Sequence, residues 1–167
     1  MTIQDLGSIG ELIAAIATVA TLGYLAVQIR QNTRSVRASS RLAVSRTYNE
    51  HSRLRLDPMV NRAYLQGLRA SPDMSFAERG TFANVLSDHW VFFQGAFALH
   101  EEGQLDRQTY DDYLTWFACQ VATPGGRAFW SEVSAVGLKP AMAAVNERIQ
   151  RGDLPDILQF SFNRMDP

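Results

Sequence analysis

Histidine, cysteine and carboxylate side chains are the groups in this sequence with the chemistry for metal binding or catalysis. The three histidines are His51, His89 and His100, and the single cysteine is Cys119. A di-metal centre in a helical protein needs Glu-x-x-His pairs on two helices, and no such pair occurs. One cysteine forms neither an internal disulfide nor a multi-cysteine zinc site. The sequence therefore predicts no metal and no cofactor.

Motifs for nucleophilic or nucleotide chemistry are absent as well. Cys119 follows the apolar residues 116–118, a context that predicts an inert buried thiol. The chain has no G-x-S-x-G elbow, no P-loop and no dinucleotide fingerprint. The PGGR stretch at 124–127 fits either an anion site at a helix N-terminus or a tight corner between helices, and we favour the corner. No catalytic residue is assigned, and we expect a protein that is not an enzyme.

Aromatic residues are dense between residues 90 and 130, where they line either a ligand cavity or a core. Their three- and four-residue spacing favours a core that buries Trp90 and Trp130. Phe92 departs from this spacing, so we consider it a candidate contact for a ligand or a partner. Arg127 and Trp130, on a later predicted helix, are candidates for the same contact.

The elements that position these residues are predicted to be helices throughout. No segment alternates polar and apolar residues long enough to indicate a strand. A first helix is predicted to continue to about Leu56. Its weaker apolar-to-small seam is predicted at Ile29, Thr33, Val36, Ser40, Ala43, Thr47 and Leu54. Capping residues predict five more helices, at about 58–69, 76–101, 106–121, 124–137 and 140–152. We expect an all-α fold in which an N-terminal membrane helix continues into a basic helix and a compact bundle of about five helices.

Charge is distributed unevenly along the 167 residues, although the net charge is only −1. Residues 1–29 carry −2, residues 30–56 carry +6 and residues 57–167 carry −5. The small net charge argues against a nucleic-acid partner. These blocks predict a membrane anchor at 1–29, a basic juxtamembrane helix at 30–56 and a cytoplasmic helical domain at 57–167.

An apolar run from Ile9 to Ile29 is long enough to cross a bilayer. Its 21 residues correspond to about 30 Å of helix, and nine are Leu, Ile or Val. Two alternatives remain open: a cleavable signal peptide, which lacks a basic n-region here, and a helix buried in a soluble oligomer. The arginines that follow predict a single-pass membrane protein with a cytoplasmic C-terminal domain.

Two further surfaces are predicted on this first helix. Its basic stripe is expected to contact membrane lipids through Arg30, Arg34, Arg37 and Arg41. Four small residues share one face of this helix, namely Gly10, Ala14, Ala17 and Thr21. They are expected to permit close packing against another helix, and hence a homo-oligomer or a larger membrane complex. The alternative for the arginines is a helix face exposed to solvent, and the alternative for the small residues is a stripe that arises by chance in an Ala-rich helix.

The order of these features resembles a widespread group of small bacterial proteins of unknown function. The resemblance rests on the opening LGSIGELIAAIATVATLGYLAVQIRQNTRSVRAS and then on DPMVNRAYLQGL, SFAERGTF, HEEGQLDRQTYDDY and PGGRAFWSE. It implies a membrane-anchored cytoplasmic helical domain and carries no activity. The resemblance also implies that the membrane is the bacterial inner membrane. The anchor, the arginines and the absence of a catalytic motif predict an accessory or scaffolding subunit of a membrane assembly. The alternative is a soluble helical oligomer that binds an apolar small ligand.

Overall fold

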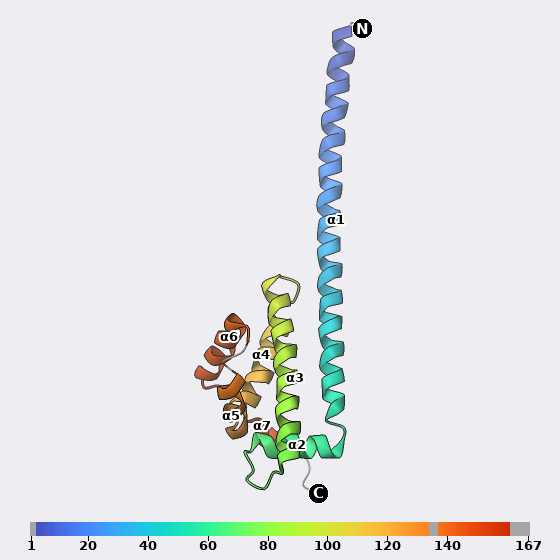
Figure 1. Ribbon diagram of the computed structural model, residues 1–167. Helices are drawn as coiled ribbons and strands as arrows, with labels where there is room; N and C mark the ends of the chain where they lie inside the picture. The colour runs from blue at the N-terminus through green and yellow to red at the C-terminus, as the bar shows by residue number, and fades with distance from the viewer. Residues whose placement is uncertain (1–2, 134–136, 161–167) are drawn as a thin grey trace. The chain divides into compact units, whose positions relative to one another are not determined.

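The computed structural model describes residues 3–133 and 137–160, and all regular structure within these residues is helical (Figure 1). The all-α prediction is confirmed to that extent. The chain divides into two compact units. We call Met1–Ser39 the N-terminal unit and Ser40–Pro167 the helical unit.

The first helix, α1, runs from Ile3 to Leu54 without interruption. Neither glycine nor proline occurs between Tyr24 and Leu56, so no residue in this half favours a break. The helix was predicted to end at Leu56 and ends two residues earlier, at Leu54, because Asp57 begins the next cap.

Helices α2 (Pro58–Leu68) and α3 (Phe76–Glu101) begin after the N-cap residues that were predicted from the sequence, Asp57 and Ser75. The Asp57 carboxylate accepts hydrogen bonds from the amides of Met59 and Val60 at 2.7 and 3.3 Å. Ser75 and Glu78 form a reciprocal capping box, which satisfies N–H groups that a helix start leaves unpaired.

The second half of the helical unit contains four shorter helices, namely α4 (Arg107–Val121), α5 (Pro124–Val133), α6 (Lys139–Gln150) and α7 (Ile157–Phe160). Asp106 caps α4 through the amide of Thr109 at 3.0 Å. Helix α5 was predicted to continue to Gly137; it is helical to Val133, and residues 134–136 of the prediction lie outside the described residues. The short helix α7 was not predicted, because four residues carry too little periodicity to indicate a helix.

Aromatic rings from α3, α4 and α5 form the centre of the core. Phe93 and Phe117 are fully buried and stack at 5.7 Å with nearly parallel planes. Trp90 stacks on Phe117 at 5.6 Å and meets the edge of Trp130 at 5.0 Å. Only 4% of Trp90 and 9% of Trp130 are exposed, so the prediction that both are buried is confirmed.

Glycines let α2 and α5 cross with their backbones in contact. A Cβ atom at Gly125 would lie 1.7 Å from the carbonyl oxygen of Gly67, and one at Gly126 would lie 2.0 Å from that of Gln120. Both glycines are buried. The PGGR stretch is therefore a tight corner between helices, and its glycines are required for close approach.

The last turns of α1 pack on the helical unit through a face that differs from the predicted seam. Val44 is buried and Tyr48 and His51 are half-buried, whereas Ala43, Thr47 and Leu54 are exposed. The Tyr48 ring lies 5.2–5.9 Å from three aromatic rings, those of Phe92, Tyr113 and Trp116. Of the seven predicted seam residues, Ser40 is half-buried and hydrogen-bonds to Gln104, and the other six are exposed. The seam prediction was therefore wrong at six positions, because the large side chain of Tyr48 takes the buried face.

Candidate functional site

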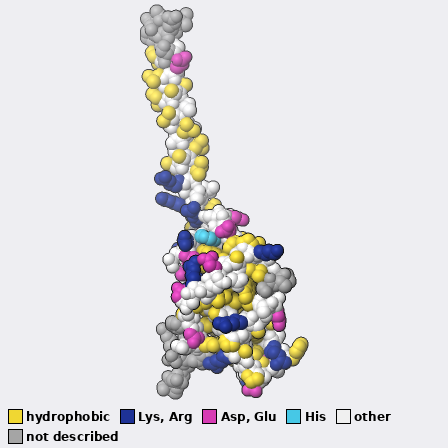
Figure 2. All heavy atoms as spheres, turned by 90° about the vertical axis from the view of Figure 1, so that its left-hand side faces the viewer, with side chains coloured by type: hydrophobic (Ala, Val, Ile, Leu, Met, Phe, Trp, Pro, Cys, Tyr) yellow, Lys and Arg dark blue, Asp and Glu magenta, His cyan; other side chains and the backbone are white. Residues whose placement is uncertain are grey.

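The N-terminal unit presents a long apolar surface. Every described side chain from Ile9 to Ser39 is exposed, and large apolar residues between Ile9 and Ile29 are 47–69% exposed. Figure 2 shows hydrophobic side chains along this part of the molecule, followed by Lys and Arg side chains. The helix is long and apolar enough to cross a membrane.

Polar side chains within this apolar stretch are bonded inside the helix itself. The hydroxyl groups of Thr18 and Thr21 each donate to the carbonyl oxygen four residues earlier, at 2.8 Å. The Gln28 amide donates to the Tyr24 hydroxyl at 3.1 Å. Because these are the four polar residues between Leu12 and Ile29, the segment needs little help from water to satisfy its polar groups.

The four arginines expected to contact lipid are distributed over both units. Arg30, Arg34 and Arg37 are exposed in the N-terminal unit, and Arg41 belongs to the helical unit. Hydrogen bonds from Thr109 lower the pKa of Asp106 most, and the charge of Arg41 lowers it further. Arg41 therefore acts on a carboxylate of the helical unit.

The small-residue stripe keeps its predicted geometry on α1. Gly10, Ala14, Ala17 and Thr21 lie on the exposed helix, and a Cβ atom at Gly10 would meet open space. The Thr21 hydroxyl is turned back to the Ala17 carbonyl. Packing of this face against another helix remains a prediction.

Phe92 contacts the end of α1. It is 7% exposed, and its ring lies 5.9 Å from Tyr48 and 6.0 Å from His51. Its departure from the α3 core spacing is explained by this packing. A role in ligand or partner contact remains a prediction.

Arg127 and Trp130 occupy structural positions on α5 and do not meet Phe92 in any described contact. Arg127 donates from Nε to the carbonyl oxygen of Ala122 at 3.0 Å and so satisfies a free carbonyl at the end of α4. Trp130 donates from Nε1 to Oδ1 of Asn146 at 2.9 Å, which ties α5 to α6.

A buried polar network was not anticipated from the sequence. Oε1 of Gln120 accepts a hydrogen bond from the Tyr64 hydroxyl at 2.9 Å and lies 2.7 Å from Nδ1 of His89. All three residues are at most 2% exposed. Since a carbonyl oxygen only accepts, Nδ1 of His89 carries the proton in this arrangement. The available signal was Gln120 itself, a polar residue at an inward position of α4, three residues after Phe117.

Burial controls the ionisation of this network. Desolvation lowers the pKa of His89 to about 4, against the opposing effect of its bond with Gln120, so the imidazole is neutral at pH 7. Desolvation likewise raises the pKa of Tyr64 to about 12. The guanidinium of Arg55 lies 5.3 Å from the centre of the Tyr64 ring, as expected for a cation–π contact. Neutral, mutually bonded groups of this kind fix side-chain positions in a core.

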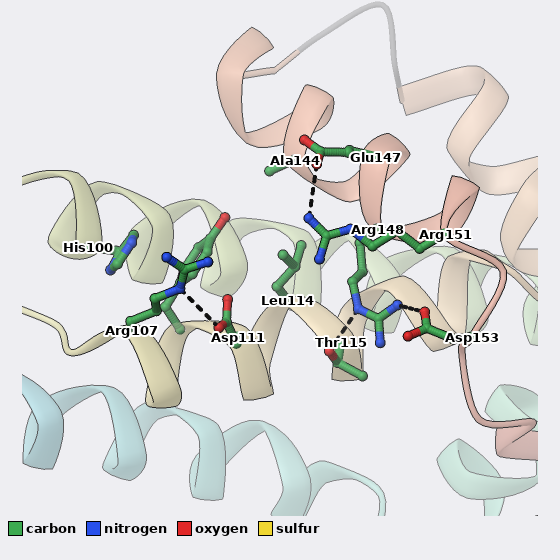
Figure 3. A pocket seen from close by; sticks show the side chains of 11 residues that line it. His100, Arg107, Asp111, Leu114, Thr115, Ala144, Glu147, Arg148, Arg151 and Asp153 are labelled. Carbon is green, nitrogen blue, oxygen red and sulfur yellow. Dashed lines mark hydrogen bonds and ion pairs between the residues drawn. The ribbon is translucent and has the colours of Figure 1, made fainter.

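A polar pocket of about 480 Å³ lies between α4 and α6 (Figure 3). Its lining includes Arg107, Arg148 and Arg151, together with Asp111, Glu147 and Asp153. The charges of the six balance, so the pocket carries no net charge that would select an anion or a cation.

The arginines of this pocket are already paired. Arg107 lies 3.6 Å from Asp111, Arg151 lies 2.9 Å from Glu147, and Arg148 is bonded to Asp153. Nε of Arg148 also donates to the Thr115 hydroxyl at 3.1 Å. Burial and then neighbouring carboxylates raise the pKa of Tyr110 on the same wall. The ion pairs lie within α4 or at the C-terminal end of α6, and the hydrogen bond from Arg148 to Thr115 connects α6 to α4.

Cys119 borders two smaller hollows of about 250 and 270 Å³, lined in part by Pro155 and Ile157. Burial raises the pKa of its thiol, so the thiolate that would act as a nucleophile is disfavoured. Across residues 3–133 and 137–160, no group of three His, Cys, Asp or Glu side chains is placed to hold a metal ion.

Comparison with known proteins yields no match to a protein family, to a curated protein or to a solved structure. The resemblance to small membrane-anchored bacterial proteins therefore stays an expectation from the sequence.

Proposed function

We propose that this chain is a single-pass protein of the bacterial inner membrane, with Ile9–Ile29 in the bilayer and the helical unit in the cytoplasm. The observation that carries the proposal is the exposed apolar surface of α1, where Thr18, Thr21 and Gln28 each donate a hydrogen bond within the helix. Lipid would cover about ten large side chains that water otherwise faces, each favoured by roughly 1.5–3 kcal/mol when fully buried.

The orientation follows from charge on the two sides of the segment. Residues before it are acidic, and the block from Arg30 to Leu56 carries +6. Basic residues next to a span are retained on the cytoplasmic side. The helical unit is accordingly proposed to be cytoplasmic, with Met1 on the opposite side.

Within this role, the helical unit is proposed to be a scaffolding or accessory subunit rather than an enzyme. Its most strongly perturbed titratable groups, His89 and Tyr64, bond to Gln120 inside the core. Its pocket arginines bond to carboxylates of the same chain. These groups are used for packing and internal pairing, which supports a structural rather than a catalytic role.

Carbonate extraction of membranes from cells that express the full chain tests the anchor. The wild type should stay in the pellet, and Val19→Arg at the centre of the span should reduce that fraction, because an arginine there costs about 2.5–3.5 kcal/mol. Val36→Arg, which adds the same side chain outside the span, should have no effect. Release of the wild type as a detergent-free oligomer would favour the soluble ligand-binding alternative instead.

A reporter fused after Pro167 tests the orientation separately. A cytoplasmic C-terminus predicts fluorescence from a fused green fluorescent protein and no activity from fused alkaline phosphatase. Phosphatase activity would contradict the proposed topology.

A further inference from the structure

The charges that follow the apolar segment lie on one side of the helix. Arg30, Arg34 and Arg37 are spaced by four and three residues, which places them within about 60° around the helix axis. The other residues between Arg30 and Ser39 carry no charge. Charge confined to one face fits a negatively charged partner that approaches from that side.

The arginines of the basic block differ in their interactions with other residues of the chain. The charge of Arg41 acts on Asp106, the carboxylate that caps α4. Arg55 lies over the ring of Tyr64. These two arginines therefore have partners within the helical unit. Arg30 and Arg34 are exposed and directly follow the apolar segment.

The level of the bilayer surface is indicated by two neighbouring residues. Tyr24 and Gln28 are hydrogen-bonded to each other near the end of the apolar stretch, and tyrosine is enriched where hydrocarbon meets headgroups. At 1.5 Å per residue, Arg30 lies about 3 Å and Arg34 about 9 Å beyond Gln28. A headgroup layer is about 5–7 Å deep on each side, so both flexible side chains reach it.

We propose that Arg30 and Arg34 together bind the phosphate of one anionic phospholipid headgroup. Side chains four residues apart on a helix are neighbours, with Cβ atoms about 5–6 Å apart. Two guanidinium groups on one face match the oxygens of a phosphate by bidentate hydrogen bonds. This inference rests on the proposed membrane anchoring and adds the class of lipid and the residues that select it.

Native mass spectrometry of the full-length chain tests this selection. The protein is held in non-ionic detergent micelles that contain either phosphatidylglycerol or phosphatidylcholine, and bound lipid is titrated. The wild type should bind phosphatidylglycerol more tightly. The variant R30Q/R34Q should weaken that binding about thirtyfold, or about fivefold per arginine. Phosphatidylcholine binding should weaken less, because the choline ammonium already neutralises that phosphate.

The matched control is R46Q/R53Q, which removes two exposed arginines of the same helix and the same net charge. Its phosphatidylglycerol affinity should stay within twofold of the wild type. Equal losses in the two variants would show a diffuse charge effect and overturn the proposal. Unchanged affinity in R30Q/R34Q would overturn it as well.

Two further measurements identify the ligand and separate the two proposals. Millimolar inorganic phosphate should leave bound phosphatidylglycerol in place, and displacement would indicate a site for free phosphate and overturn the lipid assignment. If the wild type resists carbonate extraction while R30Q/R34Q keeps its lipid affinity, only the headgroup inference fails. If carbonate releases the wild type, the membrane anchoring fails first.

Discussion

Replacing Gln120 by methionine removes the shared acceptor of the buried network at nearly constant volume. The Tyr64 hydroxyl and Nδ1–H of His89 both lose their partner in a site that is almost fully buried. An unsatisfied buried donor costs about 1–3 kcal/mol, so two of them predict a loss of about 2–6 kcal/mol in the free energy of unfolding. Urea denaturation of the detergent-solubilised full chain, followed by tryptophan fluorescence, measures the loss.

A double-mutant cycle with Tyr64→Phe tests whether Gln120 is the acceptor for the Tyr64 hydroxyl. Tyr64→Phe in the wild type removes one hydrogen bond and should cost about 1 kcal/mol. In the Gln120→Met background the same change removes a hydroxyl whose proton has no acceptor, so it should cost less than in the wild type. An equal cost in both backgrounds, or a loss below 1 kcal/mol for Gln120→Met, would show that Gln120 is not the shared acceptor.

Four other outcomes follow from the structure. The folded pKa of His89 is about 4 and its ordinary value is 6.5, so the unfolded chain binds the proton more readily. The free energy of unfolding should therefore fall by up to about 3 kcal/mol as the pH drops from 6.5 to 4. This pH dependence should vanish in His89→Gln when urea midpoints are compared across pH. Trp90→Ala should cost about 3–5 kcal/mol, and an unchanged melting temperature would contradict the stacking of this ring on Phe117. Gly125→Ala forces the backbones of α5 and α2 apart and should cost about 3 kcal/mol in thermal melts, whereas Gly80→Ala, where a Cβ atom meets open space within a helix, should stabilise by about 0.5–1 kcal/mol. Changing Gly10 and Ala14 together to leucine should abolish crosslinked oligomers and leave membrane insertion intact, and a monomeric wild type in mild detergent would refute packing through this face.

Helix boundaries were predictable because their causes are local. Asp57, Ser75 with Glu78, and Asp106 each cap the helix that follows within three residues, so a short stretch of sequence is enough to locate the start. The apolar stretch after Ile9 could be predicted as a membrane-spanning candidate from its length and composition alone.

Features that depend on distant residues were not predictable to the same degree. The buried face of α1 is set by Tyr48, which fits among rings of α3 and α4, and a seam of small residues gave no sign of this. Gln120 gains its role from Tyr64 and His89, which are 56 and 31 residues away along the chain. Phe92 departs from the periodicity of its own helix because it packs on α1.

The crossing of α2 and α5 has a consequence for how the protein is made. Gly67 and Gly125 meet backbone to backbone, yet 58 residues of chain separate residue 67 from residue 125. At about 5–20 residues per second, the ribosome needs about 3–12 s to synthesise that interval. During this time the side of α2 that carries Gly67 has no α5 to cover it, while the apolar N-terminal segment has already left the ribosome. The nascent chain therefore presents two uncovered apolar surfaces at once. If the N-terminal segment inserts into a membrane early, as proposed, a single surface is left for chaperones to protect.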